Sequence, residues 1–250
     1  MSNDPMHQFH IEPIVPLHIG NLDASFSNAS LFMIAGVAAA AGLMLWGMRP
    51  AAMTPGRGQT AVETLYGFVH SMVKDNAGDE GVKRFFPFIF TIFMFVFMAN
   101  MLGMFPYWFA TTGQIVITAT LALIVFASVI LVGFAKNGFK FFKLFVPRGV
   151  PWYVLWFVVI IEIISFFSRP LSHSVRLWAN VFAGHVLLKV FAGFVPMMAA
   201  AGGAVALGSV LPFAMTTALY ALEFLVAALQ AYVFAMLTTL YLNDALHPGH

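Results

Sequence analysis

Cysteine is missing from this 250-residue sequence, and charged residues are scarce. Without cysteine there is no disulfide, zinc–thiolate or thiol chemistry, so a metal could bind only through histidine or carboxylate groups. Charged residues make up 9% of the chain, against about one quarter in a soluble domain. Apolar residues make up 61% and the mean hydropathy is +0.89. The composition therefore predicts an integral membrane protein.

Basic residues are few and spread out, which excludes a nucleic-acid-binding patch. The net charge is +2, and the twelve Lys and Arg lie mainly in segments between apolar runs. Such a distribution is typical of topology signals. Residues 1–30 contain no Lys or Arg and so lack the basic region of a secretory signal. We interpret them as a retained extracytoplasmic tail.

The apolar runs predict an all-α membrane fold with about five crossings. Residues 31–48 form a first transmembrane helix, residues 60–76 an amphipathic surface helix, and residues 85–135 a transmembrane hairpin. Residues 152–250 form a pair of helices that carry polar residues. Each member of this pair is too long for one perpendicular span, so it is either broken or strongly inclined. The pattern alone does not choose between these two geometries.

The basic residues also predict the orientation. The positive-inside rule places residues 49–84 and 136–148 in the cytoplasm. The N-terminus, the connection at Pro106 and the turn at Gly202 and Gly203 then lie outside.

Polar side chains recur at intervals of seven inside the last two apolar stretches. Glu162, Arg169 and Arg176 lie on one face of the first helix, because seven residues turn a helix nearly twice. Glu223 and Gln230 repeat the interval on the second helix. A charge at the centre of a bilayer costs about 2.5–3.5 kcal/mol, so these groups need partners or water. Two facing polar stripes would form a water path.

Simpler interpretations of these residues remain open. In one such interpretation the charges serve only to form ion pairs, Arg176 with Glu223 and Glu162 with Arg169. Arg169 could instead extend its charge to the interface by snorkelling. His185 could be an ordinary core histidine, although an imidazole titrates near neutral pH and so suits a proton relay.

Residues 172–185, which read SHSVRLWANVFAGH, resemble subunit a of the F-type ATP synthase membrane sector. The resemblance extends to Glu162, to the sequence SRP at 168–170, to Asn100 within ANMLGMFP and to Gln230. It spans roughly residue 85 to the C-terminus. In that family the last two helices are long and lie steeply inclined beside a rotating ring of c subunits.

The resemblance also implies roles for the polar residues. The arginine matching Arg176 faces the ring between two offset aqueous half-channels, with Gln230 opposite it and Asn180 one helical turn further on. His185 and Glu223 match the pair usually assigned to the outer half-channel, with acid and histidine exchanged relative to some members.

Two further residues complete the implied set. Glu162 would line the inner half-channel, and His173 adjoins this set.

The implied function is hydrogen ion transport that drives a rotary motor for ATP synthesis. Partners would be the c-subunit ring, peripheral-stalk b-type subunits, membrane lipid and protons, with no cofactor and no metal. No phosphate-binding GxxxxGK[ST] motif occurs, so the chain should not be an enzyme by itself. The expected location is a bacterial inner membrane, with the mitochondrial inner membrane as the alternative.

Three other functions predict different features. A secondary transporter should show two similar halves with paired broken helices. A metal-dependent membrane enzyme should show clustered ligands such as HExxH. A scaffold between ring and stator would leave the buried polar stripe unexplained. Neither internal symmetry nor clustered histidine ligands are found in the sequence.

Overall fold

The computed structural model describes residues 9–16, 18–19, 22–23, 25–48, 56–105, 108–146 and 151–246. Arg49, Pro106 and Arg148, on which part of the orientation prediction depends, lie outside these residues. So do parts of the predicted tail and the last four residues. In the described chain, five helical segments are long and apolar enough to cross a membrane. This confirms the predicted all-α membrane fold with about five crossings.

Two small antiparallel sheets precede the helices. β1 (Pro13–Val15) pairs with β4 (Phe26–Ser27), and β2 (His18–Ile19) pairs with β3 (Leu22–Asp23). α1 (Asn28–Gly47) then begins, and the Ser27 hydroxyl accepts a hydrogen bond from the Ser30 amide at 3.4 Å. A serine in this position caps the free amides of a first helical turn.

α2 (Arg57–Gly103) is two helices joined at Gly78, whose φ of 66° is left-handed. The first part includes the predicted amphipathic segment. Its apolar residues Val62, Val69 and Val73 are buried, whereas Glu63 and Lys74 are exposed. Gly47 of α1 lies against the Val62 side chain, so closely that a Cβ atom at Gly47 would collide with it. The apolar face of this segment therefore packs against protein side chains.

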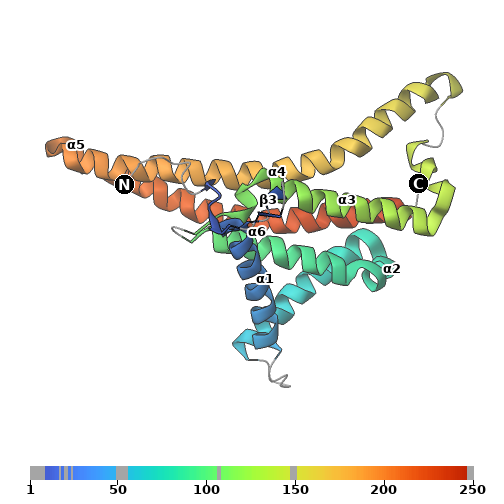
Figure 1. Ribbon diagram of the computed structural model, residues 1–250, viewed down its shortest axis with the longest axis horizontal. Helices are drawn as coiled ribbons and strands as arrows, with labels where there is room; N and C mark the ends of the chain where they lie inside the picture. Colours follow the sequence, from blue (N-terminus) through green and yellow to red (C-terminus); the bar gives the residue numbers. More distant parts are fainter. Residues whose placement is uncertain are drawn as a thin grey trace. The chain divides into compact units, whose positions relative to one another are not determined.

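The remaining helices include the two long ones. η2 (Thr111–Gly113) leads into α3 (Ile115–Asn137), which is followed by η3 (Gly138–Phe145). α4 (Trp152–Ala201) has 50 residues and is drawn in Figure 1 as one continuous helix. α5 (Gly203–Gly208) and α6 (Val210–Leu246) complete the chain.

Two glycines end α4. Gly202 and Gly203 have φ angles of 72° and 58°, which a side chain would strain. Between Trp152 and Ala201 the helix passes Pro170 and Pro196 without an interruption. Of the two geometries left open by the length of this stretch, the unbroken one is observed.

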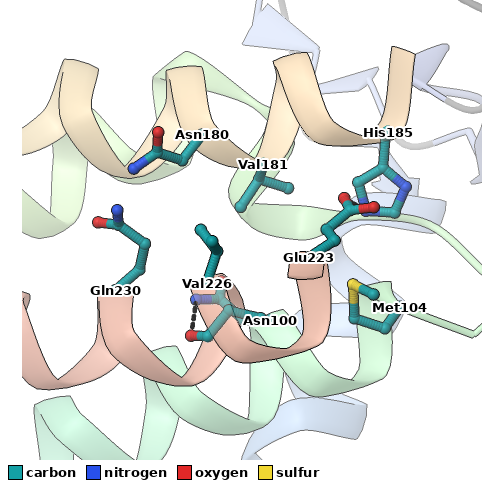
Figure 2. A pocket seen from close by; sticks show the side chains of 9 residues that line it. Asn100, Met104, Asn180, Val181, His185, Glu223, Val226 and Gln230 are labelled. Carbon is teal, nitrogen blue, oxygen red and sulfur yellow. Dashed lines mark hydrogen bonds and ion pairs between the residues drawn. The ribbon is translucent and has the colours of Figure 1, made fainter. Parts of the chain in front are cut away.

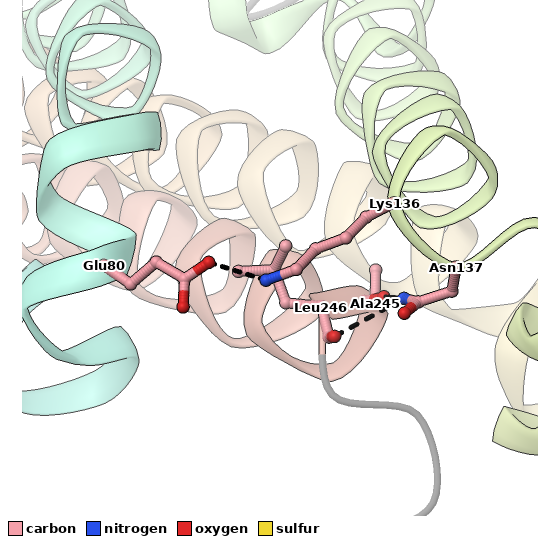
Figure 3. Close-up of polar contacts among 5 residues, drawn as sticks. All are labelled: Glu80, Lys136, Asn137, Ala245 and Leu246. Atoms are coloured by element: carbon pink, nitrogen blue, oxygen red, sulfur yellow. Dashed lines mark hydrogen bonds and ion pairs between the residues drawn. The ribbon is translucent and has the colours of Figure 1, made fainter.

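The chain folds into two compact units, each assembled from separate segments. The first contains Met1–Ala40, Phe95–Gln114 and Leu177–Ala231, and the second contains Ala41–Met94, Ile115–Arg176 and Tyr232–His250. Within the second unit, Lys136 donates to Glu80 at 2.6 Å and the Asn137 amide donates to the Ala245 carbonyl at 2.7 Å (Figure 3). These bonds connect the end of α3 to α2 and α6.

Within the first unit, Asn100 connects three elements. Its amide donates to the Ala227 carbonyl of α6 at 3.0 Å and accepts from the Thr112 hydroxyl of η2 at 2.7 Å. The side chain is 3% exposed. Because water cannot replace these bonds in a buried position, Asn100 determines how α2, η2 and α6 meet.

We therefore predict that Asn100→Ala destabilises the protein by about 0.6–2 kcal/mol for each interhelical hydrogen bond removed. Thermal unfolding of the purified protein in detergent measures this change. Asn76→Ala is the matched control, because the Asn76 amide donates to Met72 of its own helix. Equal effects of the two substitutions would contradict the connecting role of Asn100.

Candidate functional site: a buried acid–imidazole pocket

A small pocket in the first unit brings together polar residues from α2, α4 and α6. We call it the Glu223 pocket. Its polar lining residues are Asn100, Asn180, His185, Glu223 and Gln230. Figure 2 shows the side chains of His185 and Glu223 close together at one end of the pocket, with Asn180 and Gln230 pointing toward each other at the other end.

Helical spacing explains why these side chains meet. On α6 the buried residues follow a stripe that includes Glu223, Ala227 and Gln230, at steps of four and three. On α4, Val181 and His185 are four residues apart and both are buried. The residues predicted from seven-residue spacing on α6 therefore face into the unit.

Glu223 and His185 form the ionisable pair of the pocket. The His185 Nε2 atom lies 3.6 Å from the Glu223 Oε1 atom, and both residues are 9% exposed. Neither carboxylate oxygen has a hydrogen-bond partner among the described residues. A buried carboxylate without such bonds is unfavourable unless it is protonated or solvated, so this pair is suited to binding and releasing a proton.

Gly184 permits the close approach of Glu223. A Cβ atom at Gly184 would lie 2.7 Å from the Glu223 Oε1 atom and 2.9 Å from its Cδ atom. A Cβ atom does not come within 3.0 Å of such neighbours, so any larger residue would move the carboxylate. Glycine at this position thus allows the acid to lie against α4 beside His185.

The other predicted residues lie on α4 outside the lining of this pocket. Arg176 is exposed and Glu162 is half-buried. His173 is 3% exposed, its ring lies 3.7 Å from that of Phe234, and its Nε2 atom lacks a hydrogen-bond partner in the described chain. The structure thus brings together four of the seven predicted residues: Asn180, His185, Glu223 and Gln230.

The alternative ion pair between Arg169 and Glu162 is wrong, because Arg169 has another partner. Its Nη1 atom donates to the Asp244 Oδ2 atom at 3.1 Å, and its guanidinium lies 5.1 Å from the Tyr241 ring. Arg169 therefore pairs with Asp244 of α6 and not with Glu162. Asp244 was missed because it follows the last apolar stretch in the sequence, where a charge needs no partner.

Sequence reasoning also left Asn100 and Met104 out of the site, although both line the pocket. Asn100 carried a signal, since it is a lone amide within an apolar run. Met104 carried none. Its carbonyl accepts a hydrogen bond from the Tyr220 hydroxyl at 2.9 Å, a contact between residues 116 positions apart.

The fold and the pocket define a multi-pass helical membrane protein with an ionisable pair buried among its helices. Residues 30–243 match the family model described as ATP synthase A chain. The chain belongs to this family.

Full-length relatives agree with this assignment. The chain is 59% identical to ATP synthase subunit a of Parvibaculum lavamentivorans over 99% of this chain and 95% of that one. It is 58% identical to ATP synthase subunit a of Chelativorans sp. over 100% of both chains. It is 57% identical to the protein of that name from Rhizobium etli, over 100% and 99%. The relatives support a multi-pass bacterial membrane protein.

We predict that Gly184→Ala lowers proton pumping by the assembled complex by on the order of tenfold or more, because small misplacements of reacting groups are costly. Fluorescence quenching of a pH dye in inverted vesicles measures the rate of proton pumping. Gly193→Ala is the control on the same helix, since nothing lies within 4 Å of a Cβ there. A Gly184→Ala complex that assembles and pumps normally would show that the position of the Glu223 carboxylate does not matter.

Proposed function

We propose that the chain is the proton-translocating stator subunit of a bacterial rotary ATP synthase. The observation that carries the proposal is the Glu223 pocket, where an acid and an imidazole lie 3.6 Å apart among apolar helices. Because carboxylate and imidazole groups both exchange protons readily, such a pair can pass protons between water and a site within the membrane.

The proposed partner is a ring of c subunits against α4 and α6. In an 18-residue apolar window of α4, only 6% of the window is buried by the rest of the chain. Arg176 is exposed on this helix, where Leu171 and Phe167 are also exposed, at 65% and 61%. An arginine facing lipid is costly, so a protein partner with a complementary carboxyl group would stabilise it. Contacts with b-type stalk subunits and lipid belong to the same proposal.

The proposed mechanism follows from charge in a low-dielectric medium. A ring carboxyl group arriving from lipid is neutral, because an isolated charge in hydrocarbon is prohibitive. Opposite Arg176 it ionises, and its proton leaves by an inner half-channel lined by Glu162. It is neutralised again by a proton supplied through His185 and Glu223.

Polar residues on α4 and α6 would separate the two half-channels. A guanidinium group is a fixed positive charge and not a proton carrier, so Arg176 would block direct passage of protons between the half-channels. Asn180 and Gln230 would provide hydrogen bonds near it. His173, buried against Phe234, would hold α4 and α6 in register beside the proton path.

The helix lengths fit this arrangement. At 1.5 Å per residue, the 50 residues of α4 extend about 75 Å. This is more than twice the hydrocarbon thickness of about 30 Å. We therefore infer that α4 is strongly inclined in the membrane and can follow the rim of a ring. By this proposal ATP is made or hydrolysed by other subunits, and the chain alone is not an enzyme.

Arg176→Ala tests the function directly. In sealed vesicles containing the assembled complex, we expect ATP-driven proton pumping to fall to background while assembly and ATP hydrolysis persist. Arg57→Ala, which removes an exposed arginine of α2, should leave pumping intact. Normal pumping by the Arg176→Ala complex would overturn the proposed role of this residue.

Exchange of the acid and the imidazole tests the pair. His185→Ala and Glu223→Ala should each reduce proton flux, because each removes one proton-binding group. The double variant His185→Glu with Glu223→His should recover part of the flux, since the two groups then remain neighbours. Passive proton flux through membranes stripped of the soluble sector is the measurement. A double variant no better than the single ones would argue against a proton-sharing pair.

A further inference from the structure

Phe9, near the start of the described chain, packs against the imidazole of the pocket. The centroid of its ring lies 6.2 Å from that of His185 at an interplanar angle of 89°, and 5.0 Å from the ring of Phe182. Phe182 and His185 are three residues apart on α4 and therefore neighbours on its surface. His185 thus has Glu223 on one side and an aromatic edge contact on another.

The η2 region holds this ring in place. The side-chain amide of Gln114 donates a hydrogen bond to the Phe9 carbonyl at 2.6 Å. Gly113 lies beneath the ring, because a Cβ atom there would come within 2.6 Å of the Phe9 Cε1 atom. The absence of a side chain at Gly113 therefore makes room for Phe9.

The residues after Phe9 are attached to the start of α1. The side-chain nitrogen of Asn28 donates a hydrogen bond to the His10 carbonyl at 2.9 Å. The side-chain oxygen of Asn28 accepts a hydrogen bond from the Glu12 backbone amide at 3.2 Å. The backbone amide of Asn28 donates to the Glu12 carbonyl at 3.1 Å. With β1 paired to β4, these bonds give Phe9 a defined position.

We propose that Phe9 is a positioning residue for proton transfer: its ring covers one side of His185 and keeps the imidazole directed toward Glu223. An aromatic edge contact restricts rotation of the imidazole and excludes water from that side. This inference rests on the proposed proton-translocating function. It adds a residue from the N-terminal segment to a site otherwise formed by α2, α4 and α6.

Thiol labelling tests the covering role without any assay of proton transport. The chain has no cysteine, so Met104→Cys places one thiol in the lining of the pocket. In a complex whose other subunits carry no cysteine, Phe9→Ala should increase the rate of labelling by a small water-soluble reagent several-fold. Phe9→Tyr should keep the slow rate.

Phe32→Ala is the matched control, because Phe32 contacts the rings of Trp108 and Phe109. It removes an aromatic ring from the same unit without removing the cover from His185. An unchanged labelling rate in Phe9→Ala, or an equal increase in Phe32→Ala, would overturn the covering role.

A double-variant comparison tests whether Phe9 acts through His185. We expect Phe9→Ala to reduce passive proton flux several-fold when His185 is present, and to have no further effect in a His185→Ala complex. An equal reduction in both backgrounds would show a merely structural role and overturn the proposal. If His185→Ala leaves no measurable flux, the labelling rates decide. They remain informative even if Arg176→Ala disproves the proposed function, so the two failures can be distinguished.

Discussion

An ionisable side chain inside a membrane protein needs a partner, a proton or water, and this requirement organises the first unit. The buried Glu223 carboxylate has its Oε1 atom 3.6 Å from the His185 Nε2 atom. The packing around it follows from that contact. Gly184 gives the carboxylate room, and Asn100 joins α2, η2 and α6 around it. A polar group exposed to hydrocarbon is costly, and packing of this kind keeps the carboxylate beside the imidazole and away from lipid.

The long helices relate this pocket to a larger assembly. α4 runs for 50 residues and its apolar window is almost unburied within the chain, whereas the corresponding window of the Gly203–Leu246 segment is 44% buried. A helix so little covered by its own chain is completed by lipid or by another protein. Arg176 on that helix favours a protein that offers a negative charge. Membership of the ATP synthase subunit a family and the geometry of the pocket therefore support the same proposal.

Pattern and packing contributed differently to the prediction of the site. The interval of seven on α6 correctly indicated that Glu223 and Gln230 would face the protein interior, because helical periodicity depends only on local geometry. The same interval on α4 did not, since Arg176 is exposed and Glu162 is half-buried within the chain. The alternative in which Arg169 pairs with Glu162 was wrong, since its partner Asp244 lies 75 residues away. Asn100 was visible as a lone amide in an apolar run, but its two partners were not. Phe9 had no signal, because nothing near it in the sequence indicates a contact with α4.

Composition and periodicity were thus sufficient for the membrane class, the five spans and the polar face of α6, since these depend on hydropathy and on the 3.6-residue turn. They could not decide whether α4 is broken or continuous. They also could not identify which polar groups touch, because contacts between distant segments depend on how whole helices pack. The 3.6 Å approach of His185 to Glu223 and the cover provided by Phe9 are tertiary features. They exist because residues more than a hundred positions apart, such as Phe9 and Gln114, are brought together only when the chain has folded.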